Sequence, residues 1–264
     1  MLEALIRREN AVVAGALFAL IILAWLALLA GAGTGMSVTA MSGWWLPMSL
    51  PAGESWPWNA YYWAIAFVMW AVMMVAMMLP SAAPMILLYA RVVRRAVAQA
   101  DTVGGHSCIA AFAGGYLTLW ILFSVLAVVL QFSLERAVLM TIMMNSRSAT
   151  LSGALLISAG VYQLTPLKSA CLKHCRSPAT YLAEHWRPGT AGAWRMGLEH
   201  GAYCVGCCAV LMLLLFVGGV MNLIWIAGLS LFVALEKLAP FGVGLAGALS
   251  IILIAGGAAL IIAA

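Results

Sequence analysis

The chain has 264 residues, of which 66% are apolar and 8% carry a formal charge, whereas an ordinary soluble domain is roughly 45–50% apolar and about 25% charged. This composition excludes a globular protein of the cytosol, because the apolar excess must face lipid. Long apolar runs also exclude a disordered or collagen-like chain. The six cysteines do not indicate a disulfide scaffold, since the chain is too long and too apolar for a small secreted domain.

Apolar runs of about 20 residues, the length that crosses a bilayer as a helix, predict an all-α, polytopic transmembrane bundle that forms one integral membrane domain over residues 1–264. We count about seven spans. The fourth is short, and the sixth is shorter and runs directly into Glu236 and Lys237, so six spans plus a re-entrant segment is the alternative. The predicted spans are residues 11–30, 60–79, 108–132, 151–167, 197–220, 223–235 and 241–264.

The first span follows Arg7 and Arg8 in the manner of a signal peptide, but its apolar run exceeds the roughly 7–15 residues of a signal core, so we predict a membrane anchor. Basic residues predict the orientation. If the N-terminus is cytoplasmic, eleven of the 13 Lys and Arg residues face the cytoplasm and only Arg136 and Arg147 lie outside. This asymmetry predicts a multi-pass protein of the cell inner membrane, whose partner is the lipid bilayer and not a nucleic acid.

Tryptophans gather in the predicted outer loop, residues 31–59, where an aromatic belt at the headgroup level is favoured over a binding lip. After the second span, residues 85–99 predict a helix that leaves the membrane and carries three arginines to anionic lipid. The tryptophans are Trp44, Trp45, Trp56 and Trp58, and the arginines are Arg91, Arg94 and Arg95.

The densest group of metal-ligating side chains lies at the beginning of the fifth predicted span. At about 100° per residue on a helix, one face presents an imidazole and three thiols, which are ligands of Cu(I) and Zn(II). These residues are His200, Cys204, Cys207 and Cys208.

A second group, Cys171, His174 and Cys175, stands at the cytoplasmic end of the fourth predicted span. Because the fourth span ends and the fifth begins at the same membrane face, five of the six cysteines are expected to converge there. A single cysteine in an apolar helix usually serves packing, whereas five thiols and two histidines at one depth favour metal or redox chemistry. Cys108 is expected to serve packing only.

Five methionines lie close together in the second predicted span. Met69, Met73 and Met77 form a stripe at helical spacing, and Met74 and Met78 lie on another side of the helix. A thioether stripe can pass Cu(I), which accepts soft uncharged sulfur. Methionine also fills gaps in packed helices, and the sequence favours neither interpretation.

Two carboxylates stand at predicted membrane boundaries, Glu199 beside His200 and Glu236 at the end of the sixth span. Charged groups at membrane depth are costly and often functional, so each is a candidate charge or proton site. Snorkelling to the boundary and a local ion pair between Glu236 and Lys237 are the equally weighted alternative.

Together, several motifs resemble a bacterial family of uncharacterised proteins described as predicted metal-binding integral membrane proteins, over roughly residues 60–264. The resemblance implies a multi-span inner-membrane protein whose Cys and His motifs bind metal. It specifies no reaction and no particular metal. The motifs are residues 73–80, 162–175, 199–208 and 234–240, and the implied ligands are Cys171, His174, Cys175, His200, Cys204, Cys207 and Cys208.

The leading hypothesis is a soft-metal protein, for copper first and zinc second, that takes up or delivers the ion at the cytoplasmic membrane boundary with a donor or acceptor protein.

The first alternative is a membrane thiol-disulfide oxidoreductase, because Cys204 and Cys207 form a CxxC at an expected helix start, where thiolate is favoured. No outer cysteine supports it. The second alternative is an accessory subunit of a larger membrane complex that carries haem on His200 and a methionine. The chain shows no catalytic acid–base pair, which argues against hydrolase and transferase chemistry. The sequence favours a protein that is not an enzyme but leaves the oxidoreductase alternative open.

Overall fold

The computed structural model describes residues 2–42, 58–100, 105–140, 144 and 146–263. These residues form helices and connecting turns, with an isolated antiparallel bridge between Met140 and Ser146, so the predicted all-α class is confirmed. The helices are α1 (Leu2–Leu29), the 3-10 turn η1 (Gly31–Gly33), α2 (Val38–Met41), α3 (Ala60–Ala100), α4 (Gly105–Arg136), α5 (Ala149–Gln163), α6 (Pro166–Arg176), α7 (Pro178–His185), α8 (Gly189–Met212), α9 (Leu215–Gly218), α10 (Leu223–Leu238) and α11 (Gly242–Ile262).

Within the described part of the chain, five segments are long and apolar enough to cross a membrane, which suggests a multi-pass membrane protein. They are Asn10–Leu29, Ala60–Val97, Gly105–Arg136, Gly189–Gly218 and Gly242–Ile262. The helices α5 and α10 have 15 and 16 residues and are therefore only about 22–24 Å long, short of a hydrocarbon core of about 30 Å. Seven full spans are thus not shown.

Two predicted boundaries are wrong. The second span and the helix after it form one 41-residue helix, α3, that continues through Pro80 and Pro84. Pro80 and Pro84 have no N–H to donate to the carbonyls of Ala76 and Pro80. The hydroxyls of Ser81 and Tyr116 both donate to the Met78 carbonyl, which lies between those two positions. The fifth span is expected over residues 197–220, whereas α8 begins at Gly189 and ends at Met212. Cys204 therefore lies inside α8 and not at a helix start.

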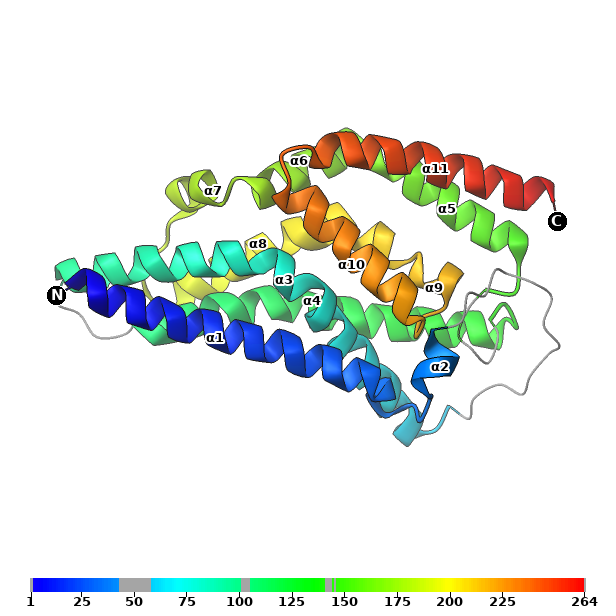
Figure 1. Cartoon of the computed structure of the whole chain (residues 1–264), viewed down its shortest axis with the longest axis horizontal. Helices are drawn as coiled ribbons and strands as arrows, with labels where there is room; N and C mark the ends of the chain where they lie inside the picture. The colour runs from blue at the N-terminus through cyan, green and yellow to red at the C-terminus, as the bar shows by residue number, and fades with distance from the viewer. Residues whose placement is uncertain (1, 43–57, 101–104, 141–143, 145, 264) are drawn as a thin grey trace.

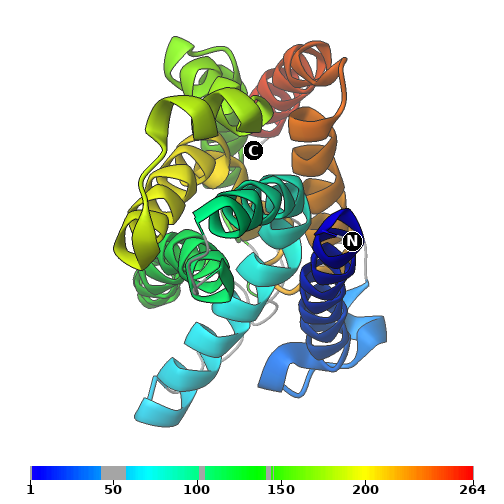
Figure 2. The same ribbon diagram turned by 90° about the vertical axis from the view of Figure 1, so that its left-hand side faces the viewer.

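The helices pack in close pairs (Figures 1 and 2), α4 against α8 and α5 against α11, with α1 beside α3 and α10 between α3 and α11. Glycines allow the close approach. A Cβ on Gly197 of α8 would overlap the Phe112 carbonyl oxygen of α4, and one on Gly153 of α5 would lie 2.6 Å from the Gly257 carbonyl oxygen of α11. Such small-residue contacts are typical of helix pairs in membranes.

In Figure 1 the N-terminus is drawn at one end of the long axis and the C-terminus at the other. The short helix α7 lies on the N-terminal side, and α6 lies closer to the middle, near the beginning of α11. Of the tryptophans expected in an aromatic belt, Trp44, Trp45 and Trp56 lie outside the described residues. The indole of Trp58 donates to the Glu135 carboxylate at 2.8 Å and its ring packs edge-on against Tyr62.

Candidate metal centre

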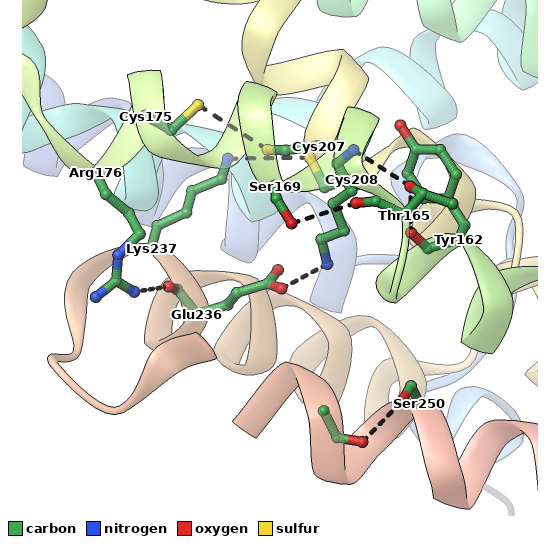
Figure 3. Close-up of polar contacts among 12 residues, drawn as sticks. Tyr162, Thr165, Ser169, Cys175, Arg176, Cys207, Cys208, Glu236, Lys237 and Ser250 are labelled. Atoms are coloured by element: carbon green, nitrogen blue, oxygen red, sulfur yellow. Dashed lines mark hydrogen bonds and ion pairs between the residues drawn. The ribbon is translucent and has the colours of Figure 1, made fainter. Parts of the chain in front are cut away.

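Five sulfur atoms from three helices form one group, which we call the sulfur cluster: Met78 of α3, Cys175 of α6, and Cys204, Cys207 and Cys208 of α8. The Sγ atoms of Cys175 and Cys207 are 4.0 Å apart, and the Sγ of Cys208 lies 3.7 Å from the Sδ of Met78. Cys175 also contacts Cys204. The three α8 thiols and Met78 are at most 1% exposed. Figure 3 shows Cys175 of α6 directed at the α8 thiols.

The local sequence explains how α6 reaches α8. Thr165 caps the N-terminus of α6 by accepting a hydrogen bond from the Lys168 amide, and Pro166 occupies the first turn. Gly206 provides the space, since a Cβ there would lie 2.8 Å from the Sγ of Cys171. The Tyr162 hydroxyl at the end of α5 donates to the Gly206 carbonyl. The close approach therefore depends on a glycine between the two cysteines of the CxxC motif.

Lys237 of α10 brings a positive charge to the sulfur cluster. Its Nζ donates to the Sγ of Cys204 at 2.9 Å and lies 3.9 Å from that of Cys208, and the residue is only 5% exposed. Such a buried ammonium is stable only beside an electron-rich partner. Lys237 is not among the site residues predicted from the sequence. The sequence feature that could have indicated it is a charged residue directly after an apolar run.

The alternative of a local ion pair between Glu236 and Lys237 is wrong. The Glu236 carboxylate is fully buried and binds Lys168 of α6 at 2.5 Å. Consecutive residues point about 100° apart on a helix, so Glu236 and Lys237 serve different partners. Glu199, the other candidate charge site, forms a partly exposed ion pair with Arg187 at 2.8 Å.

His200 and Tyr116 extend the centre on the α4 side. The Tyr116 hydroxyl lies 3.2 Å from the Sγ of Cys204. His200 is buried among aromatic rings, with centroids 5.7 Å from Tyr181 and 5.8 Å from Tyr116, and its Nδ1 has no hydrogen-bond partner among the described residues. An unpartnered buried nitrogen one turn from Cys204 is available as a ligand. Tyr116 is not predictable from the sequence, because an isolated tyrosine in an apolar helix carries no motif.

Cys171 and His174 lie outside the sulfur cluster, nearer the surface. His174 stacks on Tyr203 at 4.1 Å, with its Nδ1 2.9 Å from the Ala170 carbonyl. Burial, and then the neighbouring Cys207, raise the pKa of the Cys171 thiol. Hydrogen bonds to Cys204 and Cys207, and then burial, raise the pKa of Cys175. Both α6 thiols are therefore protonated near neutral pH when no metal is bound.

The centre is not a preformed metal site with a complete set of ligands. Over the described residues, no group of three or more His, Cys, Asp and Glu side chains is arranged to hold a metal ion. Thioether sulfurs are outside that set of ligands, and the thioether of Met78 contacts a thiol of the cluster. The other four predicted relay methionines are all buried in the core, namely Met69, Met73, Met74 and Met77.

The sequence model of a family described as PpoB2, copper chaperone, matches residues 67–260. No curated protein and no solved structure matches the chain. The matched region runs from α3 into α11 and contains the whole sulfur cluster together with Lys237 and His200. It covers well over half of the 264 residues, and the family description favours copper over zinc as the predicted metal. The chain therefore belongs to the PpoB2 family of copper chaperones.

Proposed function

We propose that this protein binds Cu(I) as cargo in the sulfur cluster, at the cytoplasmic boundary of the inner membrane, and passes the ion to an acceptor protein. The observation that carries the proposal is the convergence of four thiols and one thioether from α3, α6 and α8 in one buried group. Thiolate and thioether ligands select Cu(I) over harder ions. The family match supports copper as the cargo.

Charge balance supports a monovalent cargo. Metal ligation removes protons from thiols, so two ligating thiolates and one Cu(I) leave a net charge of −1. The ammonium of Lys237, 2.9 Å from Cys204, neutralises that charge in a buried site where an unpaired ion is costly.

A surplus of ligands suits delivery better than permanent storage. A closed structural metal site has about four ligands, and the sulfur cluster alone offers five sulfur atoms. His200, Cys171 and His174 are three further potential ligands near the cluster. Cys171 and His174 lie between the cluster and the surface on α6, where an acceptor can take the ion. The methionine stripe of α3, with Met78 at the cluster, is the proposed relay on the other side.

The test is anaerobic titration of the detergent-purified protein with Cu(I) against a colorimetric Cu(I) chelator. Cys204→Ser and Cys207→Ser are expected to weaken Cu(I) binding on the order of tenfold or more, about 1.4 kcal/mol. Cys108→Ser, which changes the cysteine at the start of α4 outside the cluster, is the matched control and retains wild-type binding. Met78→Leu tests whether the thioether of Met78 contributes to Cu(I) binding.

Wild-type protein that binds no Cu(I), or binds Zn(II) more tightly than Cu(I) under the same competition, would contradict the proposal. Equal losses in the Cys108 and Cys204 variants would show that general destabilisation and not ligation is being measured.

Thiol-disulfide exchange is the second candidate function, favoured by the 4.0 Å between the sulfurs of Cys175 and Cys207. A disulfide needs about 2.05 Å, within reach of a rotamer change. In such an exchange the two thiols are oxidised as a disulfide of a substrate protein is reduced. Trapping of mixed disulfides in cells with Cys207→Ser, compared with wild type and Cys108→Ser, distinguishes this function from copper delivery.

A further inference from the structure

A cavity of about 530 Å³ lies on a different face of α6 from the sulfur cluster, between α6, the end of α5, the end of α10 and the start of α11. Its polar lining comes from Gln163, Lys168, Ser169, Lys173, Arg176, Ser177 and Glu236. Figure 3 shows Arg176 and Glu236 on the side of α6 away from Cys175. The volume is typical of a small-ligand site.

Two side chains deep in this cavity have unused hydrogen-bonding atoms. Gln163 is 6% exposed, and neither its Oε1 nor its Nε2 has a partner among the described residues. Glu236 is fully buried, and while its Oε1 binds Lys168, its Oε2 has no partner there. Buried polar atoms are normally hydrogen-bonded, so these atoms indicate a ligand. Two of the three are pure acceptors, which require a group that donates N–H or O–H.

The cavity also attracts an anion. Its lining holds Lys168, Lys173 and Arg176 against the single carboxylate of Glu236. Lys168 is bound to Glu236, and the guanidinium of Arg176 donates to the carbonyls of Glu236 and Ala239. The exposed ammonium of Lys173 at the rim is therefore the cation available to a ligand.

The opening is apolar on one side and lies beside a candidate membrane span. Leu164 and Val243 line it and are 62% and 65% exposed. The membrane-span candidate α11 begins at Gly242, beside this opening. A ligand that enters here carries an anionic group, a hydrogen-bond donor and an apolar part, and basic pockets between helices at this depth bind lipid headgroups.

We propose that this cavity binds the headgroup of a glycerophospholipid that carries a hydrogen-bond donor. The phosphate lies at Lys173 and Ser177, the headgroup amine or hydroxyl donates to Gln163 and Glu236, and the acyl chains leave past Leu164 and Val243. The lipid site does not rest on the copper function, although Glu236 is adjacent in the chain to Lys237 beside the sulfur cluster.

The test is native mass spectrometry of the delipidated, detergent-purified full chain with phosphatidylethanolamine or phosphatidylcholine of identical acyl chains. Both lipids carry the phosphate, and only the ethanolamine headgroup donates N–H. Retention of phosphatidylethanolamine at least about fivefold above phosphatidylcholine is expected. Gln163→Leu and Lys173→Gln are each expected to reduce that retention at least about fivefold, whereas Arg91→Gln, an exposed basic residue of α3 outside the cavity, retains it.

Equal retention of the two lipids, or insensitivity to both cavity variants, would overturn the proposal. Binding of water-soluble phosphoethanolamine as tight as that of the lipid would overturn the lipid assignment in favour of a free phosphate ester. Because the Gln163 amide has no partner in the described residues, Gln163→Leu should not lower the melting temperature of the lipid-free protein. Lys173→Gln alters an exposed side chain and tests the site independently of folding.

Discussion

Lys237 is the residue whose position most changes the interpretation of the sulfur cluster. Its side chain crosses from α10 to thiols of α8 that lie 29 and 33 positions earlier in the chain. An ammonium beside thiols stabilises them as thiolates, the form that binds metal. In the proposed Cu(I) complex, the same charge neutralises the net negative charge of the thiolate ligands.

We predict that Lys237→Met weakens Cu(I) binding on the order of tenfold or more, because a buried complex with net negative charge loses its counter-charge. Lys237→Arg retains the charge and should lie between the wild type and Lys237→Met. The measurement is the anaerobic chelator competition, with Arg91→Met in α3 as the control for loss of an exposed basic side chain outside both sites. An unchanged Cu(I) affinity of Lys237→Met would show that the lysine is not part of the metal centre.

The individual ligand types can be predicted from the sequence, but their partners cannot. Helical spacing alone places Cys204, Cys207 and Cys208 on one face of α8. The contacts of Lys237 and Tyr116 with these thiols run between helices, and helix-to-helix placement depends on packing that a local pattern does not encode. The alternative of a Glu236–Lys237 pair is wrong for the same reason, because it assumes a local pair where two long-range partners are available.

The α4–α8 pair is the element that holds Tyr116 and His200 against Cys204. Its closest approach is at Gly197, where a Cβ would overlap the Phe112 carbonyl oxygen and lie 2.9 Å from the carbonyl carbon. Backbone atoms cannot yield as a flexible side chain can. Any larger residue must therefore push the two helices apart.

We predict that Gly197→Ala lowers the melting temperature of the purified protein by several degrees, consistent with an overpacking cost of about 1–3 kcal/mol, and also weakens Cu(I) binding. The matched control is Gly256→Ala in α11, where a Cβ meets no atom within 4 Å. Thermal unfolding in detergent measures the first effect. A melting temperature equal in both variants would show that the close approach is not required.

Element boundaries are predictable where apolar runs are long and less so elsewhere. The five span candidates fall on predicted runs. The predicted second span ends before Pro80, yet α3 continues through Pro80 and Pro84. Prolines are tolerated in helices that pack against other helices in a membrane, and a local sequence pattern does not encode that packing. The predicted start of α8 is too late, since the polar and small residues from Gly189 to Arg195 resemble a loop by hydropathy but continue the helix.

At the scale of the whole molecule, charge is distributed unevenly between the two ends. The segments 91–95 and 168–195 hold eight of the 13 Lys and Arg residues. In Figure 1 the end of α3 and the helix α7 lie on the side where the N-terminus is drawn, with α6 closer to the middle. From the positive-inside rule we propose that this end faces the cytoplasm. The sulfur cluster, reached by α6, would then open on the cytoplasmic side.

We predict that Ala179→Cys in α7 reacts with a membrane-impermeant maleimide only after cells are lysed, whereas Val138→Cys after α4 reacts in spheroplasts. Both positions are exposed, so accessibility of the side chain does not limit either reaction. The unsubstituted chain, whose six cysteines are all buried or half-buried, gives the background labelling. The reverse pattern would place the N-terminus outside and refute cytoplasmic delivery.

The sulfur cluster draws its atoms from α3, α6 and α8 and its positive charge from α10, so the centre is assembled from parts that are synthesised at different times. A chain that has emerged only as far as α8 already holds every thiol of the cluster, yet it lacks the ammonium of Lys237. Copper captured at that stage would sit in an anionic, incompletely packed site. Under the proposed copper function, the site therefore becomes neutral only once α10 has packed against α8 and brought Lys237 to Cys204.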